Sequence, residues 1–161
     1  MLEIIAVFCL IGALALLILL SAIDLKHGIL PNKLVLALAL AGLAFHAATG
    51  FVYLEPLQMA LGAGAGFGLL YVIRWGASRF YGEDALGLGD VKLLAAGGIW
   101  LGVEHVLIAM TLGAFAGFLH GAGVAAYRAV KTKSKIDLHR LSIPAGPGFA
   151  VGLIAAAVIM F

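Results

Sequence analysis

Two aspartates, Asp24 and Asp90, each stand where a long apolar stretch meets a loop that carries Lys or Arg. An ionisable group at the edge of hydrocarbon is costly unless it is paired, hydrated or used, so such residues are functional candidates. If both lie at one face of a membrane, they can form a carboxyl dyad. In such a pair one member can be charged while its partner holds a proton.

Both aspartates also fit ordinary structural roles. Asp90 follows Gly87 and Gly89, which allow tight turns, and it opens an apolar helix, where aspartate is a favoured N-cap residue. Asp24 can end the first helix as an interfacial charge ahead of Lys26. An N-cap position favours an ionised carboxylate, so capping and a dyad are compatible. From these residues alone, both interpretations stay open.

The composition indicates which elements must position these acids. Of 161 residues, 64% are hydrophobic and 11% are charged. Apolar runs of about 18 residues or more recur, which is the length that spans hydrocarbon. We therefore predict an all-α polytopic membrane helix bundle of about six transmembrane helices, forming a single domain over residues 1–161 with no separate soluble domain. The expected apolar segments are 2–23, 34–53, 57–76, 91–103, 105–127 and 143–161. The shortest, 91–103, can also be continuous with its successor, which leaves five spans as the alternative.

The basic residues predict the face on which the acids lie, because short cytoplasmic loops retain Lys and Arg. All of them fall in or beside the first, third and fifth loops, whereas the even loops carry only Glu55 and Glu104. With six spans, the N-terminus and C-terminus lie outside, and Asp24 and Asp90 share the cytoplasmic side. The first segment has no basic region before it, so we expect an uncleaved first helix.

Several other functions are excluded by the composition. The net charge of +2 is spread over membrane-flanking loops, so we expect membrane lipid and no nucleic acid as a neighbour. Cys9 is the single cysteine, which excludes CxxC metal sites. His46 and His120 have no second ligand at helical spacing, so we expect no metal site and assign both to core or interhelical hydrogen-bonding roles. Trp75 and Trp100, near predicted span ends, are expected to be interfacial anchors.

Glycines recur every four residues inside the apolar segments. Such small-residue stripes let helix backbones approach closely in a membrane. We therefore predict packing faces, not a phosphate loop, at Gly62 and Gly66, Gly64 and Gly68, Gly113, Gly117 and Gly121, and Gly148 and Gly152.

Three blocks of this sequence resemble the type IV prepilin peptidase family of GxGD aspartic membrane peptidases. Ser21 to Leu34 contains an aspartate followed by an Ile-Leu-Pro-Asn turn, similar to the family's first aspartate block. Arg79 to Gly102 contains Gly-Leu-Gly-Asp, similar to the GxGD block. Near the C-terminus, Ile143 to Gly148 is similar to the family's Ile-Pro-x-Gly-Pro segment. The three blocks occur in the family's order.

The resemblance implies an aspartic endopeptidase without a cofactor, in which Asp24 and Asp90 are catalytic. One carboxylate would activate water while the other, protonated, polarises the scissile carbonyl. The implied partner is a prepilin substrate, with a short basic leader that ends in glycine at the cytoplasmic face and an apolar helix after it. The enzyme would act at the bacterial inner membrane.

The same blocks contain residues that could shape the site or bind the leader. Gly87 and Gly89 would let the backbone and the substrate approach closely, with plain turn formation as the alternative. Pro31 and Asn32 form the turn after the first aspartate, and Asn32 either caps the second helix or holds a site loop. Glu83 and Asp84 are expected to attract the basic leader, and a solvated loop face is the alternative. Lys92 is expected to snorkel towards headgroups.

One departure from the family concerns methylation. Larger members carry a cytoplasmic insertion near the N-terminus with paired CxxC motifs, associated with methylation of the cleaved substrate. Here only a ten-residue loop separates the first two apolar segments. We therefore expect no methyltransferase domain and no N-methyltransferase activity, as in the short members that serve tight-adherence (Flp-type) pili.

Three other functions remain as alternatives. A small proton- or cation-coupled membrane transporter also uses acids at the membrane edge, but no acid lies mid-span and no repeat of the first half is evident. A presenilin-like protease shares the GxGD chemistry, but no Tyr-Asp pair precedes the GxGD block. A non-enzymatic assembly protein would tolerate the loss of both aspartates.

Overall fold

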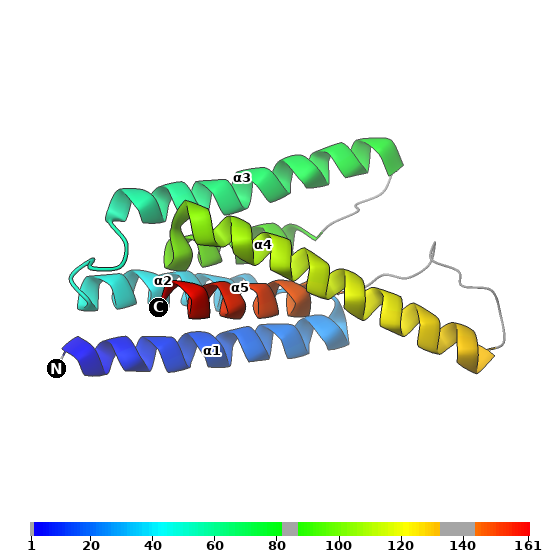
Figure 1. The fold of residues 1–161 in the computed structure, drawn as a ribbon, viewed down its shortest axis with the longest axis horizontal. Coiled ribbons are helices and arrows are strands. Elements are labelled where there is room, and N and C mark those ends of the chain that lie inside the picture. Colours follow the sequence, from blue (N-terminus) through cyan, green and yellow to red (C-terminus); the bar gives the residue numbers. More distant parts are fainter. Residues whose placement is uncertain (1, 82–86, 133–143) are drawn as a thin grey trace.

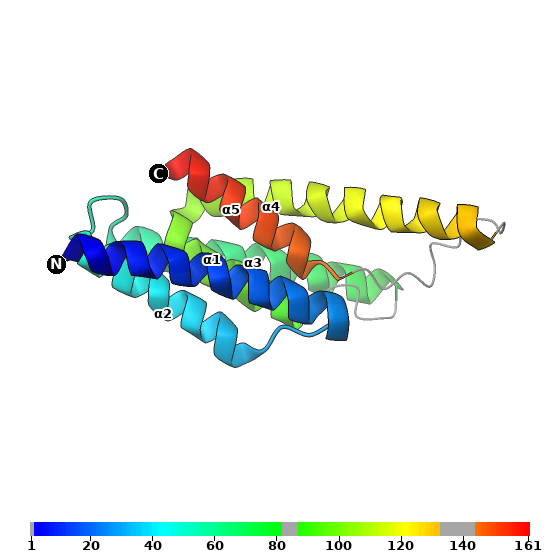
Figure 2. The ribbon, with the colours of Figure 1, turned by 90° about the horizontal axis from the view of Figure 1, so that it is seen from below.

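The computed structural model describes residues 2–81, 87–132 and 144–161, and every element in these ranges is a helix (Figure 1). The order along the chain is α1 (Leu2–His27), α2 (Asn32–Ala48), α3 (Pro56–Tyr81), α4 (Leu88–Thr132) and α5 (Gly146–Met160). The predicted all-α class is confirmed for this part of the chain. The N- and C-termini lie at the same end of the bundle (Figures 1 and 2). The number of spans and the side on which the termini lie stay predictions.

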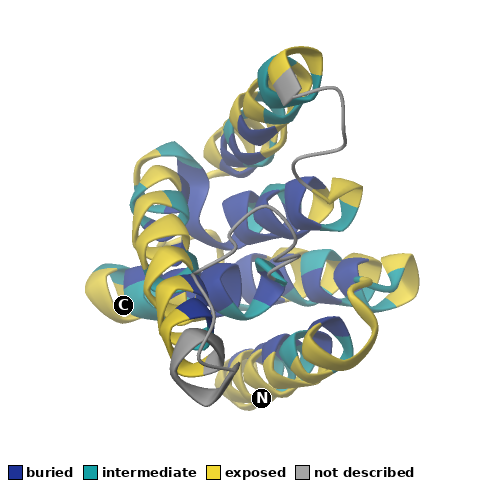
Figure 3. Cartoon of the chain, turned by 90° about the vertical axis from the view of Figure 1, so that its right-hand side faces the viewer, coloured by how far each residue is buried: buried dark blue, intermediate teal, exposed yellow. Residues whose placement is uncertain are grey.

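The helices are those of a multi-pass membrane protein in length and composition. Three segments are long and apolar enough to cross a membrane, Leu2–His27, Pro56–Phe80 and Leu88–Tyr127, and α2 and α5 are shorter apolar helices. Exposed residues lie on the outer faces of the bundle and buried residues on the faces turned inward (Figure 3). Many outer residues are large and apolar, such as Phe8, which is 69% exposed. Such a surface suits lipid, in which apolar side chains need no burial.

The long helix α4 contains a break at Gly102, whose φ of 68° and ψ of −172° are not helical. Glycine adopts a positive φ at little cost, so the chain can turn sharply there, as Figure 1 shows. The predicted segments 91–103 and 105–127 are thus the two parts of one element. The first part is central to the bundle, because only Lys92 is exposed between residues 91 and 102.

Close packing at glycines is confirmed for some of the predicted stripes. α4 packs against α2, α3 and α5, and α1 packs against α2 and α5. A Cβ added at five of the stripe glycines would collide with the backbone of a neighbouring helix, namely at Gly62, Gly66, Gly113, Gly148 and Gly152. The prediction is wrong for Gly64 and Gly68, where a Cβ would meet nothing within 4 Å. A Cβ at Gly117 would also meet nothing within 4 Å, although the Gly117 backbone is itself close to Gly148. Residues two positions apart lie on nearly opposite faces of a helix, so only one of the two α3 stripes can face α4.

Several predicted boundaries and polar roles need correction. The segment 34–53 is too long, because α2 ends at Ala48 and a turn with positive φ follows at Gly50 and Phe51. Trp100 is not an interfacial anchor. It is buried, and its indole nitrogen donates to the Leu38 carbonyl at 2.9 Å. His46 has the predicted interhelical role, since its Nε2 lies 3.1 Å from the Trp100 carbonyl oxygen, whereas His120 is exposed.

Candidate active site

Asp24 lies in the last turn of α1 and is only 5% exposed. The helix extends past the predicted segment end to His27, so the aspartate belongs to the helix itself and not to the loop. Its backbone carbonyl accepts a hydrogen bond from Gly28, which has a φ of 66° and ends α1. The glycine end of the helix therefore fixes the position of the aspartate relative to the turn that follows.

The Asp24 carboxylate contacts the beginning of α5. Its Oδ2 accepts a hydrogen bond of 2.9 Å from the backbone N–H of Gly146. The N-cap residue of α5, Ala145, makes no side-chain capping bond. Asp24 therefore satisfies one of the free N–H groups at this helix end from a distant part of the chain. The N-terminus of a helix also favours a negative charge nearby.

Sequence reasoning missed the role of Gly146, although it recognised the segment that contains it. The signal was available, because a glycine followed by Pro147 at the beginning of an apolar run is typical of a helix N-terminus. Free N–H groups at such an end need an acceptor. The sequence does not indicate which residue accepts the hydrogen bond from Gly146, because Asp24 is 122 positions away.

Asp90 is the third residue of α4 and is 7% exposed. Because the helix begins at Leu88, Asp90 occupies its third position and not the N-cap position. The Asp90 backbone N–H donates to the Gly87 carbonyl at 3.2 Å, and the Gly87 backbone also hydrogen bonds to the Asp90 carboxylate. This reciprocal contact resembles a capping box, in which an acid in the first turn bonds back to the residue before the helix.

The two carboxyls belong to helix ends that contact each other through the turn after α1. They come from opposite kinds of helix terminus, the end of α1 and the beginning of α4. The second Asp90 oxygen, Oδ1, is buried and has no hydrogen-bond partner among the described residues. A buried polar atom without a partner is costly. This oxygen is therefore a candidate contact for a molecule that enters the site.

Two contacts join the turn after Asp24 to the first turn of α4. A Cβ added at Gly89 would lie 2.8 Å from the Leu30 Cβ, so glycine lets this turn approach the helix. Lys92 Nζ donates to Asn32 Oδ1 at 2.9 Å. Asn32 is thus engaged with α4 and does not cap α2, whose N-cap is Pro31 with no side-chain capping bond. The Lys92 side chain is exposed, and its ammonium group also forms this hydrogen bond to the protein.

The remaining predicted site residues are less constrained by the structure. Pro31 accepts backbone hydrogen bonds from Leu34 and Val35 and so begins α2. Glu83 and Asp84 lie outside the described residues. Within the described ranges, no group of three or more His, Cys, Asp or Glu residues could hold a metal ion.

Comparison with known proteins identifies the family. The model of the type IV leader peptidase family matches residues 11–122, which include both aspartates and exclude Gly146. The chain belongs to this type IV leader peptidase family. The resemblance found in the sequence is therefore confirmed.

Curated relatives of this type IV leader peptidase family member are named prepilin leader peptidase/N-methyltransferase. The protein from Aeromonas hydrophila is 38% identical over 108 residues, which are 67% of this chain and 37% of the relative. That from Escherichia coli (strain K12) is 40% identical over 97 residues, 58% of this chain and 42% of the relative. That from Dickeya chrysanthemi is 45% identical over 98 residues, 58% of this chain and 34% of the relative. The matched region thus spans well under half of each relative. No solved structure matches the chain.

Proposed function

We propose that this chain is an aspartic endopeptidase that removes the leader peptide of type IV prepilins, cleaving after glycine at the cytoplasmic face of the bacterial inner membrane. The observation that carries this proposal is that Asp24 and Asp90 are both buried, at helix ends joined by the Gly89–Leu30 approach and the Lys92–Asn32 hydrogen bond. Family membership and the names of the relatives support the same reaction.

The proposed mechanism uses the two carboxyls as one unit. Two neighbouring carboxyls share a proton, so one is a base and the other an acid. The base takes a proton from a water molecule while the water oxygen attacks the scissile carbonyl carbon. The acid gives its proton to the carbonyl oxygen. Collapse of the tetrahedral intermediate breaks the C–N bond, and the leaving amine takes a proton from the dyad. Because interacting groups titrate as a pair, we assign the roles to the pair.

The helix ends around the acids would support these steps. The N-termini of α4 and α5 lie against the Asp90 and Asp24 carboxyls and favour a negative charge there. Burial and mutual repulsion disfavour a second charge. The pair would therefore hold one net negative charge, which is the state that acid–base catalysis needs. Asp90 Oδ1 could bind the water or the scissile carbonyl.

We further propose that the chain acts as a single domain and does not methylate its product. Only residues 28–31 separate α1 from α2, which leaves no room there for an insertion with paired CxxC motifs. Its substrate would be a Flp-like prepilin with a basic leader. Mass spectrometry of the cleaved product in the presence of a methyl donor would test this, and a product that gained a methyl group would refute it.

Cleavage of a prepilin in membranes that contain the protein tests the main proposal. Asp24→Asn and Asp90→Asn should each lower the rate by about 10²–10⁴-fold or more, the usual contribution of a general acid or base. Glu104→Gln is the matched control, because it removes an exposed carboxylate near the Gly102 break. Robust cleavage by either aspartate variant, at equal expression, would refute the dyad and favour a capping or transport role.

A further inference from the structure

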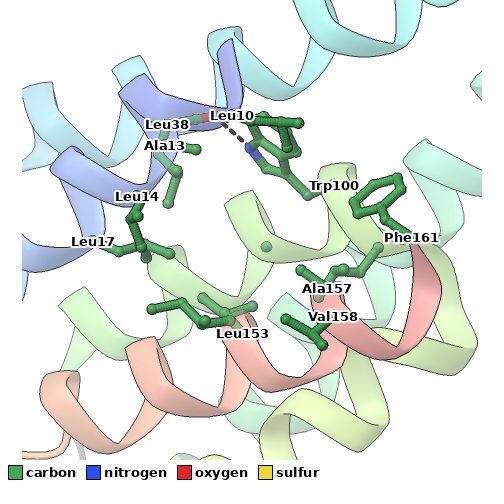
Figure 4. Close-up of a pocket in the computed structure, with 13 residues that line it drawn as sticks. Leu10, Ala13, Leu14, Leu17, Leu38, Trp100, Leu153, Ala157, Val158 and Phe161 are labelled. Atoms are coloured by element: carbon green, nitrogen blue, oxygen red, sulfur yellow. Dashed lines mark hydrogen bonds between the residues drawn. The ribbon is translucent and has the colours of Figure 1, made fainter. Parts of the chain in front are cut away.

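An apolar groove runs between α1 and α5, with a volume of about 260 Å³ (Figure 4). One wall comes from α1 and the other from α5, while Leu38, Trp100 and Leu101 line its floor. The indole nitrogen of Trp100 already donates to Leu38, as the dashed line in Figure 4 shows, so that donor is satisfied. The rim of the groove is open, since Leu14 is 47% exposed and Val158 is 77% exposed. The groove therefore accepts an apolar occupant from the side.

The groove is in register with the candidate active site on both walls. On α1, Leu10 and Leu17 precede Asp24 by fourteen and seven positions, a spacing that keeps residues close to one face of a helix. On α5, Leu153 follows Gly146, the hydrogen-bond partner of Asp24, by seven positions. At 1.5 Å per residue, the α1 wall extends from about 10 Å to about 21 Å from the level of Asp24. The groove therefore begins about 10 Å from the level of Asp24, along the α1 and α5 faces that carry Asp24 and Gly146.

We propose that this groove binds the apolar helix that follows the scissile bond of the substrate, an inference that rests on the function proposed above. Pockets that enclose a whole small ligand measure about 300–1,000 Å³, so a groove of 260 Å³ takes side chains and leaves a helix backbone outside. A helix that leaves the carboxyls and follows α1 reaches the groove after about seven residues and passes it by about the fourteenth. Apolar side chains in that interval insert between α1 and α5. Contact there sets the depth of the substrate and so places its scissile bond at the two acids.

A comparison of two substrates tests the groove separately from catalysis. The first is a prepilin with its complete apolar helix, and the second is a peptide that ends about five residues after the scissile bond. Leu14→Trp and Val158→Trp, which fill the groove, should raise KM for the helix-bearing substrate by about tenfold relative to KM for the peptide. This is the size expected for displacing one or two apolar groups. Leu19→Trp and Ile159→Trp place the same side chain at exposed positions of the same helices that do not line the groove, and they should leave the ratio unchanged.

Disulfide cross-linking provides a direct second readout. In a Cys9→Ala, Asp24→Asn background, Leu14→Cys should cross-link to substrate cysteines placed seven to fourteen residues after the scissile bond, and Leu19→Cys should not. If the unaltered protein cleaves both substrates but groove and control variants behave alike, the groove holds only lipid and this inference is wrong. If the unaltered protein cleaves neither substrate, the proposed function itself fails.

Discussion

The backbone N–H of Gly146 donates a 2.9 Å hydrogen bond to Oδ2 of Asp24, across 122 positions of the chain. This bond ties the carboxylate at the end of α1 to the first turn of α5. A Cβ added at Gly146 would lie 2.6 Å from the same oxygen, so glycine leaves the space that the carboxylate occupies. The relationship makes α5 part of the candidate site, although the family match ends at residue 122.

Gly146→Ala is therefore expected to impair cleavage without unfolding the protein. The new methyl group would push the Asp24 carboxylate out of place, and a displacement of about 1 Å can cost about 10²-fold in rate. Prepilin cleavage in membranes measures the effect. Gly64→Ala is the control, because a Cβ there meets nothing within 4 Å. An unimpaired Gly146→Ala variant would show that this contact does not position the acid.

Gly89→Ala should also reduce cleavage, through a different neighbour. Its Cβ would lie 2.8 Å from the Leu30 Cβ and would force the turn after Asp24 away from α4. Truncating the neighbour relieves the collision, so Leu30→Ala should restore part of the activity in the double variant. A cycle of the two single variants and the double variant measures this coupling, which for contacting residues is about 0.5–3 kcal/mol. Strictly additive losses would contradict the predicted contact.

The hydrogen bond between Lys92 and Asn32 should hold the two aspartate segments in register. Lys92→Met and Asn32→Leu are each expected to lower the rate of cleavage severalfold. The double variant should cleave no more slowly than the slower of the two single variants. The coupling expected for one exposed hydrogen bond is about 0.5–1.5 kcal/mol. Lys33→Met serves as the control for losing a positive charge beside the same turn. If the rate losses of the two single variants multiply in the double variant, the two side chains act independently.

Gly102→Ala is expected to act mainly by destabilising the fold, and not by a direct effect on Asp24 or Asp90. The backbone conformation at Gly102, with a φ of 68° and a ψ of −172°, is adopted almost only by glycine and costs other residues about 1–3 kcal/mol. Here the Cβ would also lie 2.8 Å from Leu54 Cδ1. Thermal unfolding in detergent should show a lower Tm than the unaltered protein. Gly76→Ala, at a helical position where a Cβ has open space, should not lower it. Equal Tm values for both variants would argue against strain at the break.

Charge reversal at Asp84 tests the predicted attraction of the basic leader. Asp84→Lys should raise KM for a prepilin and weaken the dependence of KM on salt, because screening acts on exposed charges beyond about 10 Å at 0.1 M ionic strength. Glu83→Lys should act in the same direction. Cleavage kinetics at several salt concentrations measure the effect. Unchanged KM and salt dependence would leave these residues as a solvated loop face.

The sequence predicted the helical class and both candidate acids because these depend on local patterns. Apolar run length identifies membrane helices, and Asp24 and Asp90 stand out against such runs. The contacts of the acids were not predictable in the same way. The Gly146 donor and the Lys92–Asn32 bond join segments 122 and 60 positions apart, and periodicity within one segment carries no information about them. Trp100 was misassigned because a position near a span end does not reveal that α4 turns at Gly102 and buries it.

The bond from Gly146 to Asp24 also sets an order of events during biosynthesis. Ribosomes make the chain from its N-terminus, so both aspartates are synthesised before α5 exists. A nascent chain that ends before residue 146 holds both acids, yet the Asp24 carboxylate still lacks its backbone donor. The site is therefore completed only after α5 has been made, and both acids wait in the membrane until α5 packs against α1.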